Sequence, residues 1–459
     1  MARTHDSTFQ VPELASIGLS VTPSILNRGV LVVGASGTGK SASAMLPVLS
    51  AIRRQWRATD AAGRPAALIV DPKLELVAPD DPEVIHLGRH GSAAVRFYDN
   101  TVDGRDPGVV LDEALALSPA ASPFSRDPFW RASARTLLRA CVQIDTTIFA
   151  GAPDAMSARQ QQGDIWQIIA SFFTKRGPGR ARGTAALIDM SRPWSRYLAL
   201  CRKLQRTPGD TDADTLAHDL EKVFRTHLSA YDATELLSVC SLAADTATSV
   251  VATLASLLGP LADHRVQSAI DFDFCPRGQR SDAVTMADAI AGGALLAYQP
   301  KDISDESAMI GRAIKRAYLR AITKGAACDE TGKPVRHAYY VCDEFQRFIG
   351  GEEVFFDTMR AGGGCACVAT QSLAALRHAL GDGETKESAL QAITSNLSSV
   401  IQFMSPDPLV SRTWQTLLPT PANPTLPHVL TVRPISMLPV GGAYWFSEGR
   451  FGYGQIRLQ

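Results

Sequence analysis

The sequence Gly34-Ala35-Ser36-Gly37-Thr38-Gly39-Lys40-Ser41 follows the apolar run 30–33 and precedes a segment of helical composition, residues 42–52. This order of strand, glycine-rich loop and helix is the context of a P-loop. The glycines allow backbone N–H groups to turn inward, and the start of the helix adds the positive end of its dipole at the same place. The stretch therefore predicts an α/β fold with a site for the phosphates of a nucleotide.

Two side chains of this loop match the needs of a bound triphosphate. We expect Lys40 to reach the β- and γ-phosphates as a point charge, and the Ser41 hydroxyl to bind the Mg²⁺ ion that bridges them. An ordinary tight turn is the alternative, but the flanking strand and helix argue against it. The predicted nucleotide-binding set comprises Gly34, Ser36, Gly37, Thr38, Gly39, Lys40 and Ser41.

A second informative stretch is the apolar run 337–342, which ends in Asp343 and Glu344. Asp343 would hold the Mg²⁺ ion through its water shell, and Glu344 would polarise the attacking water. Two acids after a strand are also a common surface feature. The P-loop elsewhere in the same chain favours the catalytic interpretation, and the pair predicts hydrolysis of the nucleotide.

Two further positions are candidates for contact with the γ-phosphate. Gln371 closes the apolar run 365–370, which we expect to lie beside the first two strands, so its amide would sense the γ-phosphate. Arg360 lies in a flexible segment just before that run and could stabilise charge in the transition state of a neighbouring subunit. Arg347 is the competing candidate for this role, and a surface ion pair is the alternative for either arginine.

Composition limits the class of protein. The 459 residues are 45% hydrophobic and 20% charged, enough apolar material for a large core. Lys and Arg together equal Asp and Glu at 46 each, so any nucleic-acid surface must be local. The eight scattered cysteines suit a reducing compartment. The most apolar helix candidate, residues 249–262, is shorter than the roughly 20 residues that span a bilayer, which predicts a cytoplasmic protein.

The pattern along the chain divides it into three segments. Residues 1–107 and 286–459 alternate strand-like and helical runs, whereas 108–285 show helical spacing only. This predicts a nucleotide-binding domain with a mostly parallel sheet, interrupted by an inserted all-α domain. The runs 84–87 and 95–98 are candidates for an antiparallel edge, and Glu448-Gly449 for the turn of a terminal hairpin.

A basic loop lies inside the helical segment. Lys175, Arg176, Arg180 and Arg182 occur among glycines and a proline. Such a loop is either simply solvated or a contact for the phosphate backbone of DNA.

Taken in order, these motifs resemble the TraG/TraD-type coupling proteins of conjugation and type IV secretion, which are RecA-like ring ATPases. The resemblance covers about residues 29–420 and rests on the P-loop, on Asp71-Pro72-Lys73-Leu74-Glu75, on Asp127-Pro128-Phe129-Trp130, on Asp343-Glu344-Phe345 and on Ala369-Thr370-Gln371-Ser372. The second of these is similar to an Asp-Pro-Lys-Gly-Glu signature. The third resembles the start of the family's all-α domain, and the fourth its Walker B motif.

The resemblance implies a homo-hexameric motor that uses ATP and Mg²⁺. Its partners would be DNA, which we expect to be single-stranded, a relaxase or other secreted substrate protein, and components of the secretion channel. Arg360 matches the family's proposed arginine finger in position, and Lys40, Ser41, Asp343, Glu344 and Gln371 keep the roles given above.

Two departures from the family pattern matter. Leu74 replaces the usual glycine, which predicts a different turn there. The 33 residues before Gly34 lack the apolar helix pair that many members carry, which predicts either a soluble variant or one that a partner recruits to the inner face of the membrane.

Two other functions remain as alternatives. A HerA/FtsK-like pump would act on double-stranded DNA, but those pumps lack the helical insertion that Asp127-Pro128-Phe129-Trp130 introduces. A nucleotide-gated docking receptor would bind secreted proteins without translocating anything. Such a receptor would have no need for the water-polarising Glu344.

Overall fold

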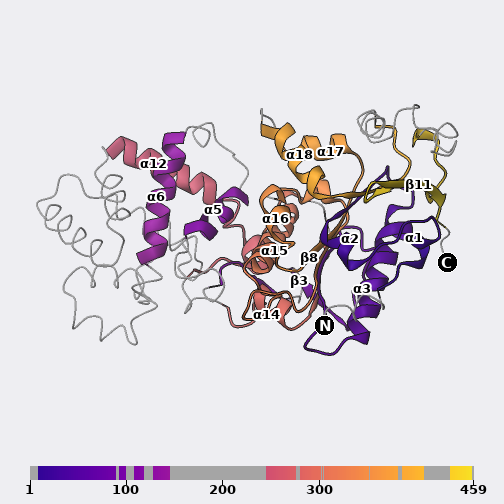
Figure 1. The fold of residues 1–459 in the computed structure, drawn as a ribbon. Coiled ribbons are helices and arrows are strands. Elements are labelled where there is room, and N and C mark those ends of the chain that lie inside the picture. Colours follow the sequence, from indigo (N-terminus) through magenta and orange to yellow (C-terminus); the bar gives the residue numbers. More distant parts are fainter. Residues whose placement is uncertain are drawn as a thin grey trace, which may run out of the picture. The chain divides into compact units, whose positions relative to one another are not determined.

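The computed structural model describes residues 9–88, 93–99, 108–117, 128–144, 244–274, 280–300, 302, 304–350, 352–380, 385–407 and 435–456 (Figure 1). The chain forms two compact units, Met1–Ala93 with Val284–Gln459, and Ala94–Ala283. The second unit is therefore inserted into the first in sequence. The first segment of the first unit ends at residue 93, whereas the sequence pattern placed this boundary at residue 107.

The first unit is built on a nine-stranded sheet with the order β11-β10-β9-β1-β8-β7-β2-β6-β3. Its strands are β1 (Val30–Val33), β2 (Ala66–Val70), β3 (Val84–Leu87), β6 (Leu295–Tyr298), β7 (Ala338–Cys342), β8 (Gly364–Thr370), β9 (Ser399–Gln402), β10 (Gly442–Ser447) and β11 (Arg450–Gln455). All neighbours from β9 to β3 pair in parallel. This confirms the predicted α/β fold with a mostly parallel sheet.

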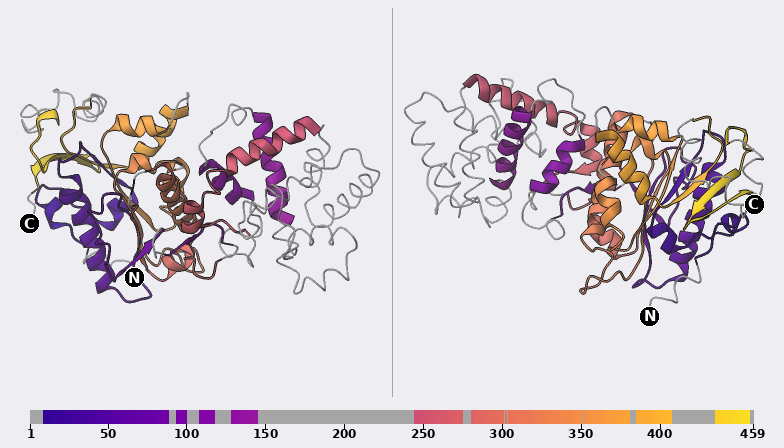
Figure 2. Two further views of the ribbon diagram at one scale, coloured as in Figure 1. Left: turned by 180° about the vertical axis from the view of Figure 1, so that it is seen from behind. Right: turned by 45° about the horizontal axis from the view of Figure 1, so that its top comes forward.

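Helices cover both faces of this sheet, as Figures 1 and 2 show. One face carries α1 (Pro12–Ala15), α2 (Pro23–Asn27) and α3 (Leu46–Ala58), and the other carries α14 (Met286–Ala291), α15 (Asp305–Thr323), α16 (Glu352–Thr358), α17 (Leu373–Ala379) and α18 (Thr385–Asn396). Because both faces are covered, the central strands β1, β2 and β7 are buried at every position. This is why they appear in the sequence as continuous apolar runs rather than alternating ones.

The face under α3 holds a closed hydrophobic core. Val30 and Val32 of β1 belong to it together with Val48 and Ile52 of α3. The N-terminal stretch completes this core, since the indole of Trp445 donates a 2.9 Å hydrogen bond to the carbonyl of Ile17. The helix that follows the P-loop is thus anchored along its buried side.

The two edges of the sheet differ from each other. The β3 strand pairs in parallel with β6, so the expectation of an antiparallel edge there was wrong. The antiparallel edge is the terminal hairpin of β10 and β11, as predicted. Its turn has φ of 52° at Glu448 and 73° at Gly449, the left-handed backbone that tight two-residue hairpins require.

The inserted unit contains the helices α5 (Gly108–Leu117), α6 (Pro128–Ile144), α12 (Ala244–Leu258) and α13 (His264–Ala269). One face of α12 and the residues after it are apolar and buried, with Val250, Leu254, Leu257, Leu258 and Leu261 all in the core. Leu137 and Leu138 of α6 are also buried. Phe129, in the first turn of α6, is 50% exposed.

The inserted unit, expected to be all-α, also contains a short parallel ladder. The β4 strand (Val95–Arg96) pairs with β5 (Ile270–Asp271), and aromatic rings flank the pair, with Phe97 and Phe272 centroids 5.1 Å apart. The carboxylate of Asp271 accepts hydrogen bonds from the backbone N–H groups of Asp273 and Arg280. The pairing of β4 with β5 is what moves the boundary of the unit to residue 94.

Some sequence predictions lie outside the described residues. These are the basic loop with Lys175, Arg176, Arg180 and Arg182, and Asp127 of the Asp-Pro-Phe-Trp segment. In the part of the chain that is described, no helix combines the length and the apolar composition needed to cross a membrane.

Candidate nucleotide-binding and catalytic site

The carboxyl ends of four neighbouring strands bring the predicted site residues to one edge of the sheet. Val33, the last residue of β1, lies opposite Thr370 of β8, and Cys342 at the end of β7 lies opposite Val70 of β2. The P-loop, Gln371, the Asp343-Glu344 pair and the segment after β2 therefore leave the sheet side by side. This is the edge at which open parallel sheets bind ligands.

The P-loop backbone depends on its glycines. Gly37 and Gly39 have φ of 76° and 98°, values that other residues rarely adopt. A Cβ atom at Gly37 would meet nothing within 4 Å, so the tip of the loop is open, whereas one at Gly34 would lie 2.7 Å from Phe403. The following helix begins with a wider π turn, Ser41–Met45.

Lys40 lies folded over the mouth of this loop. Its ammonium group donates hydrogen bonds to the carbonyls of Gly34 at 2.6 Å and Ala35 at 3.0 Å. Burial lowers the pKa of Lys40, and the nearby carboxylate of Asp343 partly offsets this effect. The charge thus lies where phosphate oxygens would enter, and the arrangement fits the predicted role of Lys40.

Ser41 and Asp343 lie close enough to share one cation. The Ser41 hydroxyl donates a 3.3 Å hydrogen bond to Oδ2 of Asp343, a fully buried carboxylate. Burial raises the pKa of Asp343, while Lys73 and Lys40 lower it. A hydroxyl and a carboxylate are ligands that Mg²⁺ accepts. Among the described residues no cluster of three or more acidic, histidine or cysteine side chains could hold a metal, so such an ion would need phosphate and water oxygens as well.

Glu344 is held by three side chains. Its Oε2 accepts hydrogen bonds from Gln371 at 2.8 Å and Gln346 at 2.5 Å, and its Oε1 forms an ion pair with Lys73. Burial alone would raise the pKa of Glu344, but the contacts with Lys73 and the two amides lower it overall. Glu344 also has φ of 50°, a strained conformation for a non-glycine residue that is typical of functional positions.

Lys73 also belongs to the site. Although Lys73 lies in one of the quoted motifs, no role was predicted for it from the sequence. The adjacent Asp71 explains its position. The buried carboxylate of Asp71 accepts hydrogen bonds from the backbone N–H groups of residues 75, 76 and 77 and from the amide of Gln299. These bonds fold the segment after β2 into a fixed loop that carries Lys73 to Glu344.

The turn within this loop has a left-handed backbone at Leu74. Leu74 has φ of 58°, a conformation that glycine adopts without strain. Leu74 therefore adopts a backbone conformation that favours glycine and is strained in it. The residue is 46% exposed.

Replacing Asp71 by alanine tests this account of the loop. The change leaves three N–H groups and an amide without their acceptor, so we expect the free energy of unfolding to fall by about 2–4 kcal/mol. Urea denaturation followed by circular dichroism measures the loss. Asp80→Ala removes an exposed carboxylate of the same segment and should change stability by less than about 0.5 kcal/mol. Equal stabilities of the two variants would contradict the role of Asp71.

Arg360 is not part of this constellation in its own chain. Its guanidinium donates hydrogen bonds to the carbonyls of Asn396 at 3.0 Å and Arg28 at 3.4 Å, residues that precede β9 and β1. Arg360 thus lies at the amino edge of the sheet, opposite the P-loop. Arg347 follows Glu344 on the P-loop side, in the turn Phe345–Arg347, and is exposed.

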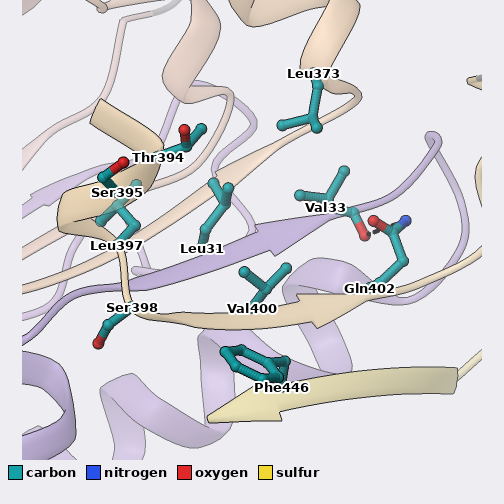
Figure 3. Close-up of a pocket in the computed structure, with 10 residues that line it drawn as sticks. All are labelled: Leu31, Val33, Leu373, Thr394, Ser395, Leu397, Ser398, Val400, Gln402 and Phe446. Carbon is teal, nitrogen blue, oxygen red and sulfur yellow. Dashed lines mark hydrogen bonds between the residues drawn. The ribbon is translucent and has the colours of Figure 1, made fainter. Parts of the chain in front are cut away.

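A separate cavity of about 280 Å³ lies against the other face of the sheet (Figure 3). It is lined by Leu31, Val33, Leu373, Thr394, Ser395, Leu397, Ser398, Val400, Gln402 and Phe446. The amide of Gln402 is engaged with the carbonyl of Phe403 at 2.6 Å. This uncharged lining of apolar and neutral polar side chains offers no charge to a phosphate, so the P-loop edge is the candidate nucleotide site.

Comparisons with known proteins agree with this fold. No family model and no curated protein sequence matches the chain. Among solved structures, the unbound conjugative coupling protein TrwBdeltaN70 aligns over 96% of this chain and 88% of its own, with a TM-score of 0.55 and 15% identity. TrwB with ADP and Mg²⁺ aligns with a TM-score of 0.54, and TrwB with the ATP analogue ADPNP with 0.55, both at 16% identity and the same coverage. The chain therefore has the RecA-like P-loop fold of these structures.

Proposed function

We propose that this chain is a Mg²⁺-dependent ATPase of the conjugative coupling type, which uses ATP to drive DNA toward a type IV secretion channel. The observation that carries the proposal is the meeting of Lys40, Ser41, Asp343, Glu344 and Gln371 at one edge of the sheet. The fold supports it, because the structures that it resembles along most of their length are of a plasmid coupling protein in complex with nucleotides.

The residues of the site divide the chemistry among themselves. Lys40 would leave the carbonyls of Gly34 and Ala35 for the β- and γ-phosphates, and Ser41 and Asp343 would hold Mg²⁺, which neutralises phosphate charge when bound. Glu344 would orient and polarise the attacking water. Gln371 reaches the carboxylate of Glu344 at 2.8 Å, so it would report the presence of a γ-phosphate to the catalytic acid.

The proposed assembly is a homo-hexameric ring. Arg360 lies at the edge of the sheet opposite its own P-loop, which fits a finger that serves the nucleotide of a neighbouring subunit. Arg347 remains the competing candidate. The cargo would be single-stranded DNA with a relaxase or another secreted protein, and partner components of the channel would bring the motor to the inner face of the membrane.

The test is steady-state ATP hydrolysis by the purified protein without DNA and with single- or double-stranded DNA, together with its mass in solution. We expect hydrolysis that single-stranded DNA stimulates, and a hexamer in that condition. A preference for double-stranded DNA would favour a HerA/FtsK-like pump. ATP binding without hydrolysis in any condition would favour a docking receptor.

Removal of the metal provides a separate check of the same site. Among the described residues, Ser41 and Asp343 are placed to hold Mg²⁺ there and no larger cluster of metal-binding side chains is present, so the ion should depend on the nucleotide for its remaining ligands. Excess EDTA should therefore abolish hydrolysis completely, and added Mg²⁺ should restore it at once. Hydrolysis that persists in EDTA would contradict this assignment.

A further inference from the structure

One ammonium group lies against both acids of the site. Nζ of Lys73 forms an ion pair with Oε1 of Glu344 and lies 4.0 Å from Oδ2 of Asp343. The two carboxylates are 0% and 1% exposed, whereas the side chain of Lys73 is 26% exposed. Buried acids of like charge need such a cation to remain ionised side by side.

The position of this ammonium group conflicts with that of a metal ion. Oδ2 of Asp343 faces both Lys73, at 4.0 Å, and the hydroxyl of Ser41, at 3.3 Å. A divalent ion held between Ser41 and Asp343 would use the same oxygen. Two cations within a few ångström of each other repel strongly, so Lys73 and a metal ion compete for this carboxylate.

Lys73 is free to move in a way that Lys40 is not. The ion pairs that hold its ammonium group in the described part of the chain are those with the two acids, and its flexible stem starts from a loop fixed by Asp71. Lys40, by contrast, is tied to two backbone carbonyls within its own loop. When a cation takes over Asp343, Lys73 would be left with Glu344 and the more distant charge of Glu75. Entering phosphates carry more negative charge than either acid and would attract the ammonium group.

We propose that Lys73 is a surrogate cation of the nucleotide-free site, which Mg²⁺ displaces and which then binds the terminal phosphate of a nucleoside triphosphate. The inference rests on the proposed nucleotide site. It gives the site a means of telling ATP from ADP, because only a triphosphate offers Lys73 a new partner. Glu344 then loses its ion pair at the moment when a water molecule must be polarised.

The test compares two dissociation constants within one variant. Binding of ADPNP with Mg²⁺ and of ADP with Mg²⁺ is measured by calorimetry for the wild type and for Lys73→Met. Loss of a charged contact to the terminal phosphate should reduce the preference for ADPNP over ADP by about ten- to a hundredfold. Binding of ADP should stay the same or become tighter, because a competing cation has been removed.

A second measurement addresses the surrogate role directly. Mn²⁺ binding to the nucleotide-free protein is followed by electron paramagnetic resonance. Without Lys73, the two buried carboxylates face the metal with one positive charge fewer, so the affinity of Lys73→Met for Mn²⁺ should rise by about tenfold or more. An affinity equal to that of the wild type would overturn the surrogate role.

Two further variants serve as controls for the loss of Lys73. Lys333→Met removes an exposed lysine from the loop before β7, at the far edge of the sheet, and should leave both readouts unchanged. Lys73→Arg keeps the charge and should retain most of the preference for ADPNP. The ratio of two affinities does not depend on the folded fraction, and Lys73→Gln replaces the methionine variant if that one fails to fold.

The outcomes separate this inference from the function on which it rests. A wild-type protein that binds neither nucleotide would overturn the nucleotide site itself, and Lys73 with it. A wild-type preference for ADPNP that Lys73→Met retains in full would overturn the role of Lys73 and leave the proposed ATPase intact.

Discussion

Replacing Lys40 by alanine is expected to lower the rate of ATP hydrolysis by at least about a hundredfold, the cost of losing one preorganised charge on the transferred phosphoryl group. The structure gives a reason to expect a folded variant. The ammonium group donates hydrogen bonds to the carbonyls of Gly34 and Ala35, and water can take its place at these acceptors in the space that the side chain leaves. Hydrolysis is measured by phosphate release at saturating ATP.

A matched control separates this effect from a general loss of positive charge. Lys324→Ala removes an exposed lysine just after α15, at the edge of the sheet away from the P-loop, and should hydrolyse ATP at the wild-type rate. Circular dichroism should show that both variants are folded. If Lys40→Ala turned over ATP normally, the P-loop would not be the catalytic phosphate site.

The strands of the sheet, and the strand ends that bear the site residues, could be predicted from the sequence. A strand that is buried on both faces appears as a continuous apolar run, and the run around β7 stops where Asp343 begins. In a parallel sheet all such ends lie on one edge, so an acid pair and a P-loop on separate strands were expected to meet. The 3.3 Å hydrogen bond between Ser41 and Asp343 agrees with that expectation.

The pairing of distant strands could not be predicted in the same way. A strand-like run shows which residues alternate between faces, but the identity of its partner depends on contacts between segments far apart in the chain. The run at 95–98 therefore appeared to belong to the main sheet, whereas β4 pairs with β5 in the inserted unit. The edge on which Arg360 lies follows from the strand direction, yet its hydrogen bonds to Asn396 and Arg28 depend on that same packing.

The position of Lys73 depends on side-chain contacts that no local pattern contains. Its loop is set by the carboxylate of Asp71 and by the amide of Gln299, which directly follows β6, more than two hundred residues along the chain. The available signal was the motif itself, which places a lysine two residues after Asp71, the buried acid that follows β2. The partner of that lysine became visible only when β2 and β7 were seen side by side.

Glu344→Gln is expected to keep nucleotide binding and to reduce hydrolysis by about a hundredfold or more, as removal of a general base does. The amide has the same shape, so Gln371 and Gln346 keep a hydrogen-bonding partner, but it cannot polarise water as a carboxylate does. Single-turnover hydrolysis and ADPNP binding measure the two properties separately. Glu330→Gln, which changes an exposed acid before β7, should leave both unchanged.

The backbone at Glu344 strengthens this expectation. A non-glycine residue with φ of 50° costs about 1–2 kcal/mol, and the chain accepts this cost at a position where glycine would remove it. The strain directs the carboxylate toward Lys73, Gln346 and Gln371 rather than stabilising the fold. We therefore expect Glu344→Gln to unfold at nearly the wild-type temperature while losing turnover. A variant that instead lost stability and kept its turnover would show that Glu344 serves the fold and not the reaction.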